Sequence, residues 1–201
     1  ALDAQNFTTA TDTYNTAVGY HAGVSVTTGI NNTFVGGLAG DSVTTGDNNV
    51  AVGYAALDAN QTANHNVAIG GSALGSNTTG ATNTAVGGES MTANTEGGNN
   101  VALGYQSLHD LTTGSNNVAI GYQTLSTEDA HGDNVAVGYQ SLKTLNAGAD
   151  AFNTAVGYQS GAAVTTGLQN TLIGGIAGDA LTDADSNLAV GYAALSADTL
   201  G

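Results

Sequence analysis

One short motif recurs eleven times and accounts for almost the whole chain. It reads N-(T/V)-A-(V/I)-G-(Y/G)-x-(A/S)-(L/G) and is followed by eight looser residues. The interval between copies is constant, as from Asn15 to Asn32, except that the step from Asn134 to Asn153 is longer by two. A fixed short period is the mark of a repeat architecture, in which each unit stacks on its neighbours. The motif begins at Asn15, Asn32, Asn49, Asn66, Asn83, Asn100, Asn117, Asn134, Asn153, Asn170 and Asn187.

Within each copy, the first six positions predict a β-strand. Taking the Asn as position 1, position 5 is always Gly, and positions 2 and 4 are mostly β-branched. Gly would weaken a helix by about 1 kcal/mol in every copy, whereas β-branched residues suit strands. One repeat is also too short for two helices and their turns. We therefore expect an all-β fold, a parallel β-solenoid of about eleven coils.

Positions 10 to 17 are predicted to form the turn and the return of each coil. Gly and Asn, which tolerate left-handed backbone angles, are frequent there. Thirteen of the 16 acids lie in this segment, and only Glu89 lies within positions 1 to 9 of a copy. Charge is thus kept off the strand, as stacking of strands in a buried position requires.

Identical strands at a fixed step can stack in parallel register, with equivalent residues forming columns. Each coil would add about 4.8 Å, which gives a rod on the order of 50 Å long. Asn at position 1 can form a ladder of side-chain amides. Tyr occupies position 6 in seven copies and can stack ring on ring.

Alternation along the strand gives two uncharged faces, and two arrangements of them compete. In one, the Asn, Ala and Gly of positions 1, 3 and 5 line a thin lumen, while the Val, Ile and Tyr of positions 2, 4 and 6 face a covering loop. In the other, Val, Ile and Leu fill the lumen, and the flat Ala/Gly face admits a second chain. The second arrangement is our prediction, and it implies a homo-oligomer that protects exposed strands.

The composition excludes several classes of partner and site. A formal net charge of −15, with Lys143 as the single base, argues against nucleic acid and against an anionic membrane surface. No apolar run approaches the roughly 20 residues of a membrane helix, so we expect no membrane insertion. There is no Cys, hence no disulfide and no thiolate metal site.

The organisation along the chain is a leading segment followed by one array. Residues 1–14 are expected to form a partial or irregular coil, and residues 15–201 a continuous solenoid with a longer coil at 134–152. Copies nine and ten repeat the exceptions of copies one and two, with Leu172 in the place of Phe34. A block of eight coils therefore begins again at Asn153, which suggests a piece of a longer rod.

The repeated motif resembles two related families. Strings such as Asn66–Gly70 and Asn117–Gly121 resemble the head repeats of trimeric autotransporter adhesins, although the period here is longer. The longer string NVAIGYQTL, preceded by TTGSNN from Thr112, is more similar to tail-fibre repeats of marine and other tailed bacteriophages. The resemblance implies a left-handed parallel β-roll and a homotrimer. It also implies a place on a virion or cell surface, where the rod attaches to a host receptor or glycan.

The residues that carry chemistry elsewhere do not converge in this sequence. The four His occupy different repeat positions and form no column, whereas a metal site needs converging ligands. Clusters of Asp and Asn have the oxygen ligands that Ca²⁺ prefers, but no calcium-loop pattern accompanies them. We predict no catalytic, cofactor or metal site and no enzyme. These candidate residues are His21, His65, His109 and His131, together with the clusters Asp47–Asn49, Asp133–Asn134 and Asp183–Asp185.

Three further segments also suggest a function. Gly36–Gly40 and Gly174–Gly178 look like phosphate-binding loops, but they are ordinary repeat positions and no helix is expected after them. The two-residue insertion within Lys143–Phe152 is the main break in the repeat. It predicts a bulged loop, with contact to a receptor as its functional alternative.

The sequence leads to a structural and attachment module as the first hypothesis. An ice-binding solenoid is the main alternative, because Thr recurs at positions 13 and 14, as in Thr27–Thr28 and Thr44–Thr45. A self-assembling extracellular filament subunit is a further alternative. A polysaccharide-cleaving β-helix would need acids and bases on one face, which one Lys and no Arg hardly supply.

Overall fold

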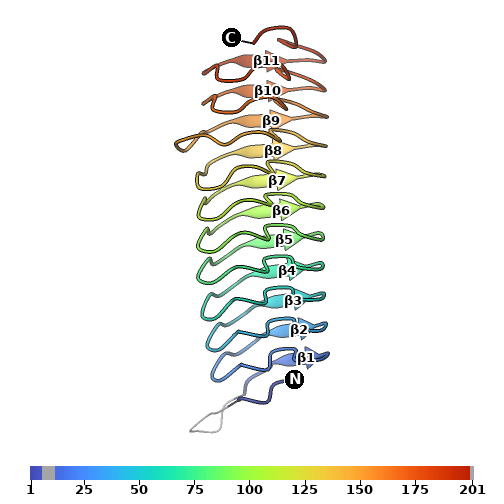
Figure 1. Cartoon of the computed structure of the whole chain (residues 1–201), viewed down its shortest axis with the longest axis vertical. Coiled ribbons are helices and arrows are strands. Elements are labelled where there is room, and N and C mark those ends of the chain that lie inside the picture. The colour runs from blue at the N-terminus through green and yellow to red at the C-terminus, as the bar shows by residue number, and fades with distance from the viewer. Residues whose placement is uncertain (6–11, 200–201) are drawn as a thin grey trace.

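The described chain winds into a single solenoid. The computed structural model describes residues 1–5 and 12–199, and within them there are eleven strands and no helix. The strands stack in chain order into one parallel sheet, each pairing only with its sequence neighbours. Figure 1 shows the strands as rungs of a rod, with the two ends of the chain at opposite ends. The all-β solenoid expected from the period is confirmed.

Each strand is three residues long and covers positions 2 to 4 of its coil, so the expected six-residue strand was too long. Gly at position 5 adopts a φ near +136°, which turns the chain out of the sheet. A Cβ on Gly53 would lie 2.6 Å from the carbonyl oxygen of Gly70 in the next coil, so a side chain has no room there. The strands are β1 (Thr16–Val18), β2 (Thr33–Val35), β3 (Val50–Val52), β4 (Val67–Ile69), β5 (Thr84–Val86), β6 (Val101–Leu103), β7 (Val118–Ile120), β8 (Val135–Val137), β9 (Thr154–Val156), β10 (Thr171–Ile173) and β11 (Leu188–Val190).

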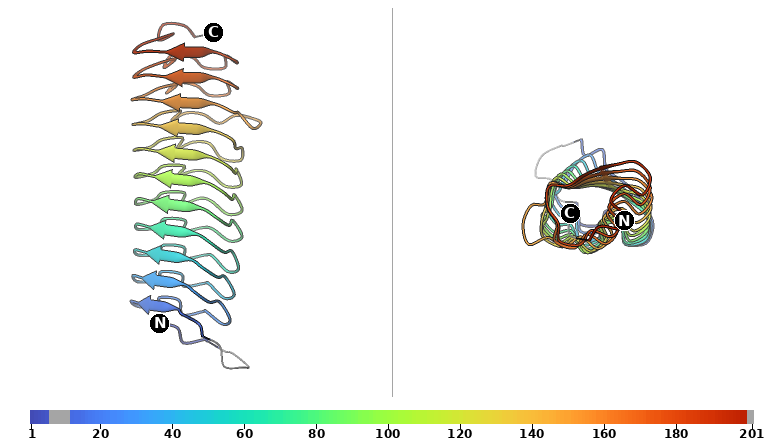
Figure 2. Two further views of the ribbon diagram at one scale, coloured as in Figure 1. Left: turned by 180° about the vertical axis from the view of Figure 1, so that it is seen from behind. Right: turned by 90° about the horizontal axis from the view of Figure 1, so that it is seen from above.

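Register is strict along the whole sheet. Thr16 pairs with Thr33, Val50 with Val67, and so on at the period of the repeat. The one longer step joins Val135 to Thr154, so the two additional residues are absorbed outside the strands. They enlarge the turn between β8 and β9, which stands out from the other turns in Figures 1 and 2. We call the coil that contains β1 coil 1, and number the others to coil 11.

The predicted orientation of the strand faces was wrong. Position 3 points inward, and residues such as Ala51 and Ala119 are fully buried. Positions 2 and 4 point outward, and Val18, Ile69 and Leu103 are exposed. The alternative arrangement was right about the inward Ala, but it expected loops over the Val and Ile face. That face is partly open to solvent, with relative exposures from 36% to 71% among its most exposed members.

The reason lies at positions 9 and 12, which already fill the lumen. Position 9 carries fully buried Leu or Met in coils 3 to 8, and position 12 carries buried Val, Leu or Asn in most coils. Little space remains opposite them, so position 3 is small. The buried apolar residues of all coils form one continuous core along the rod.

Two coils have a large residue instead of Ala at position 3, and they compensate for it with Gly at position 9. The ring of Phe34 fills the space beside Gly23 and Gly40, which both stand at position 9. Leu172 does the same beside Gly161 and Gly178. A large residue at position 3 thus takes the place of the Leu that other coils have at position 9.

The Asn column exists, but it differs from the expected amide ladder. Most of these Asn side chains donate to a backbone carbonyl and accept from the backbone N–H of the next Asn. Asn66 donates to the Gly80 carbonyl at 2.9 Å, and its Oδ1 accepts from the N–H of Asn83 at 2.9 Å. Direct amide-to-amide bonds occur at Asn134 and Asn187. The column therefore fastens the chain entering each strand both within and between coils.

The leading segment is described only in part. Leu2 donates its N–H to the carbonyl of Ala22 and packs against the core of coil 1. The rest of the predicted irregular coil at 1–14 includes residues 6–11, which lie outside the described residues.

Candidate interaction surface

Most of the large hydrophobic side chains that are exposed in the described chain lie on the outward face of the sheet or along its edge. The outward face consists of positions 2 and 4 of every coil, which carry Val, Ile, Leu or Thr. Because the strands are short and in register, these side chains form two straight columns along the rod. We call this surface the sheet face. Contiguous apolar surfaces of this kind mark interaction sites in soluble proteins.

Tyr at position 6 extends the sheet face along one edge. The rings of Tyr105, Tyr122, Tyr139 and Tyr158 stack with centroids 5.3 to 5.8 Å apart and nearly parallel planes. The predicted Tyr column is therefore confirmed for these four coils. It is interrupted in coils 2, 4, 5 and 10, where position 6 is Gly.

An amide ladder runs beside these rings at position 7. The Nε2 of each Gln donates to the Oε1 of the Gln one coil below, at 2.9 Å between Gln123 and Gln106 and 3.0 Å between Gln140 and Gln123. At its lower end, Gln106 donates to the carboxylate of Glu89 at 2.7 Å, and the Tyr105 hydroxyl also donates to it. These contacts lower the pKa of Glu89, first through Gln106 and then through Tyr105. This ladder was not among the columns expected from the sequence, although Gln recurs at position 7 in four consecutive coils.

Charge avoids the sheet face. No acid or base occupies positions 2, 4 or 6 in any coil, although the whole chain carries a formal charge of −15. Many of the acids sit in the turns, where some join neighbouring coils. Asp47 accepts the N–H of Ile30 at 2.8 Å, and Asp185 accepts that of Leu168 at 2.7 Å. Two of the acid clusters considered as cation sites thus include acceptors for backbone groups.

The Thr columns of the turns divide into two kinds. At position 13 the hydroxyls donate to the carbonyl of the equivalent residue in the next coil, as Thr78 does to Thr95 at 2.9 Å, and most of these Thr are half-buried. At position 14 the side chains are exposed, as at Thr28, Thr45 and Thr79. One of the two ranks on which the ice-binding hypothesis depends is therefore engaged in holding coils together.

The four His lie apart, as their repeat positions predicted. His21 stacks on Tyr20 with centroids 4.1 Å apart, and His109 contacts Asp110 at 2.6 Å. His65 is exposed. The glycine-rich segments Gly36–Gly40 and Gly174–Gly178 make space for Phe34 and Leu172, and no helix follows them in the described chain.

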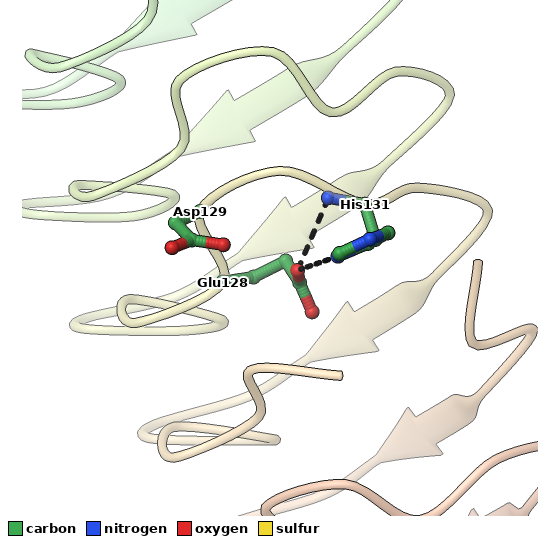
Figure 3. A group of neighbouring side chains, drawn as sticks. All are labelled: Glu128, Asp129 and His131. Atoms are coloured by element: carbon green, nitrogen blue, oxygen red, sulfur yellow. Dashed lines mark hydrogen bonds and ion pairs between the residues drawn. The ribbon is translucent and has the colours of Figure 1, made fainter. Parts of the chain in front are cut away.

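His131 belongs to a group that was not expected from the sequence. Glu128, Asp129 and His131 bring ligand atoms within 4.8 Å of one another, the one such group of three among the described residues. Both Glu128 oxygens already accept backbone N–H groups, from His131 at 3.2 Å and from Ala147 at 3.4 Å. Figure 3 shows the Glu128 carboxylate directed at His131, with Asp129 outside the marked contacts. We assign no metal to this group.

Glu128 could have been found from its repeat position. It stands at position 12, which faces the lumen and carries Leu111 in the coil below and Leu145 in the coil above. Glu128 is fully buried. Burial is the main cause that raises its pKa above the ordinary value, against the lowering effect of the two backbone N–H groups.

The enlarged turn of coil 8 is the other local departure. Gly148, Ala149 and Asp150 are exposed, and Phe152 is 56% exposed with a φ of +51°. Lys143, the only base, lies partly buried at the start of this segment. The bulged loop expected from the insertion is confirmed.

An open hollow of about 500 Å³ lies at the end of coil 11. It is lined by Ala193, Leu195 and the segment from Ser196 to Asp198. Because this hollow is formed by the last described coil, it is the exposed end of the stack, and we assign no ligand to it.

Comparison with protein-family models, curated proteins and solved structures found no match. No helix in the described part of the chain is long and apolar enough to span a membrane. The solenoid and its surface are therefore the basis for the function proposed below.

Proposed function

We propose that this chain is a structural and attachment module, a stiff β-solenoid segment of a surface fibre such as a phage tail fibre or an adhesin. The rod would work as a homotrimer and carry contact sites for a host receptor or glycan on its turns. The sheet face is the single observation that carries the proposal. An apolar face that runs along all eleven coils suits a building element of a fibre.

A second copy of the chain is the occupant that fits the sheet face best. The face contains no charge, so two copies can meet there without bringing their acidic turns together. Its columns repeat once per coil, and only a partner with the same repeat can match every coil in turn. The homotrimer expected from the family resemblance would place three sheet faces around one axis.

The size of the sheet face approaches what a stable assembly needs. Eleven coils at about 4.8 Å give a length near 50 Å, and the three-residue strands give a width of roughly 10 Å. The strands alone therefore present on the order of 500 Å² per chain, to which the Tyr edge adds, against about 800 Å² that a standard protein interface buries on each partner. Tyr, which borders this surface in seven coils, is also enriched at protein interfaces.

The proposal is tested by placing charge on the sheet face and measuring the mass of the assembly. We expect sedimentation of the unaltered chain to give a trimer, and the pair Ile69→Lys and Ile120→Lys to give monomers, because buried unpaired ammonium groups oppose association. The matched control is Thr79→Lys with Thr113→Lys, which places the same charge on exposed turn positions. The control should remain trimeric.

A monomer at all accessible concentrations of the unaltered chain would refute the assembly. Electron images of the assembled particle or filament would test the remainder of the proposal, since they would show whether the rod is part of a surface fibre.

A further inference from the structure

The junction between coil 7 and coil 8 joins coils of unequal length. In regular coils the N–H of position 14 donates to the position 13 carbonyl of the following coil. Thr79 donates in this way to Thr95 at 3.0 Å, and Thr113 to Asp129 at 3.3 Å. The N–H of position 15 often shares that carbonyl, as Gly80 does with Thr95. A carbonyl on the following coil is thus the usual acceptor for this turn.

Glu128 takes the place of that acceptor on both sides of the junction. In coil 7, the N–H of His131 at position 15 donates to Glu128 Oε1. In coil 8, the N–H of Ala147, immediately before the additional residues, donates back to Glu128 Oε2. Ala147 is buried, whereas its equivalents at position 14 of regular coils are exposed, as Thr79 and Thr113 are. One carboxylate therefore compensates for backbone bonds that the insertion displaces.

The same carboxylate faces a ring nitrogen that has no partner. Nδ1 of His131 is buried and makes no hydrogen bond, and it lies 3.6 Å from Glu128 Oε1. A buried polar atom without a partner is costly, as is a buried carboxylate without a cation. One proton held between the two groups would give the ring nitrogen a hydrogen-bond partner and would neutralise the carboxylate. The proton could sit on the carboxyl, which then donates to the imidazole, or on the imidazole, which then donates to the carboxylate.

We propose that Glu128 and His131 form a proton-binding latch that tightens the junction of coils 7 and 8, and with it the protruding turn of coil 8, when the pH falls. The proton comes from solvent and no covalent bond changes. The inference does not depend on the proposed assembly, since the latch lies within one chain.

The surroundings of the latch hold few other charges. Asp129 is the one further titratable group whose charge acts on Glu128, and it favours proton uptake. On coil 8, Asp150 accepts the N–H of Gly132 at 3.0 Å. In the lumen column, Leu111 lies below Glu128 and Leu145 above it. The described chain pairs no Lys or Arg with the carboxylate, so a proton is its available counter-charge.

The direction of the pH effect follows from burial. Since the pKa of Glu128 is raised in the folded chain, the fold takes up a proton at a pH where the unfolded chain has released it. The resulting stabilisation is fully present below the unfolded pKa of about 4.3 and is lost as the pH rises through the folded pKa.

Hydrogen exchange of the Ala147 amide tests the latch on the full chain. We expect its protection factor, corrected for the intrinsic rate, to be at least threefold greater near pH 5 than near pH 7.5, with a limit of about tenfold per pH unit. The Thr79 amide in a regular coil is the internal reference and should not change. In Glu128→Gln, which keeps a carbonyl acceptor but cannot titrate, the protection of Ala147 should be independent of pH.

A second measurement does not require a variant. Carbon-13 spectra of the unaltered chain should show the Glu128 carboxyl changing over the same pH range in which the Ala147 amide gains protection. His131→Gly restores the residue found at position 15 in Gly80 and Gly114, and it should reduce the pH dependence of the Ala147 protection because it removes the ring nitrogen that faces the carboxylate. Protection of Ala147 that is independent of pH in the unaltered chain, an equal rise in Glu128→Gln, or a Glu128 carboxyl that changes in a different pH range from Ala147 would each overturn the inference.

Discussion

At the residue scale, the packing of the core depends on the summed side-chain volume at positions 3 and 9 rather than on either position alone. Position 3 and position 9 share the same space, so Ala goes with Leu or Met, and Phe34 or Leu172 goes with Gly. Leu at position 9 has φ near +50°, as at Leu57 and Leu108. Gly40 has φ +60°, close to the value that Leu adopts at this position, so a Leu there would carry the same backbone strain as Leu57 and Leu108 do. Because the regular coils tolerate that strain, volume is what distinguishes the coils with Gly at position 9 from those with Leu.

This sharing of space predicts a compensating pair of substitutions. Phe34→Ala should lower stability by about 3 to 5 kcal/mol, because it leaves a cavity over Gly23 and Gly40. Gly40→Leu alone should also destabilise the chain through overpacking. The two together convert coil 2 to the regular pattern and should recover a large part of the loss. Thermal unfolding of the three variants checks this, and simple additivity of the two losses would contradict it.

The same pair of positions explains which part of the core the sequence could predict. Periodicity located every strand and the Asn and Tyr columns, because strict repetition leaves one register. It did not decide which face points inward, since Ala and Val are both compatible with either side. The deciding information is the left-handed backbone at position 9, which turns Leu74 and Leu108 into the lumen. The sequence does contain a signal for the inward face. Where position 3 changes from Ala to Phe or Leu, position 9 changes from Leu to Gly, which shows that these two positions share the lumen.

At the scale of the element, the Gln ladder has a direction. From Gln159 down to Gln106, each Nε2 points toward the preceding coil, and the row ends on the Glu89 carboxylate. A negative group at one end orients every amide above it, because each amide must offer its hydrogen downward. Such a row is a cooperative unit along five coils.

The ladder should therefore loosen from its acidic end when the pH falls. The pKa of Glu89 is lowered in the fold, so its contribution is present above the unfolded pKa and is lost as the pH falls through the folded one. We expect the side-chain amide signals of Gln106 to shift below about pH 4, with smaller shifts at Gln123. Glu89→Gln keeps an acceptor but cannot titrate, so its spectra should stay constant, and a shift in that variant would contradict the assignment.

Neither the ladder nor the role of Glu128 was evident from composition. Both depend on which residue of one coil lies over which residue of the next, and on how the longer coil 8 meets the regular coil 7. Glu128 in particular looks like one more acid of an acidic turn, until position 12 is known to face the lumen.

At the scale of the whole molecule, charge and apolar surface are separated. The sheet face is neutral, while the formal charge of −15 resides largely in the turns. In the proposed trimer, the acidic turns of the copies would repel one another at long range, whereas the sheet faces would attract at contact. Association would then be a balance between charge repulsion, which salt screens, and apolar contact, which salt does not screen.

This balance predicts that salt strengthens the proposed trimer. Raising the ionic strength from about 0.01 M to about 0.15 M shortens the Debye length from roughly 30 Å to roughly 8 Å and weakens the repulsion between acidic turns. Sedimentation equilibrium should show tighter association over this range. Weaker association in salt would mean that ion pairs, rather than the apolar sheet face, hold the copies together.

The neighbour-only pairing of the strands has a mechanical consequence. No described strand contacts any strand except those directly above and below it. A force applied at one end therefore acts on one seam at a time, where a seam is the set of hydrogen bonds between two adjacent coils. Each seam that opens would free one coil, or about 60 Å of slack chain, and the seam at coil 8 would free slightly more. Under tension the coils would unfold one after another from the end that is pulled. The molecule would thus lengthen in discrete steps while its covalent chain stays intact.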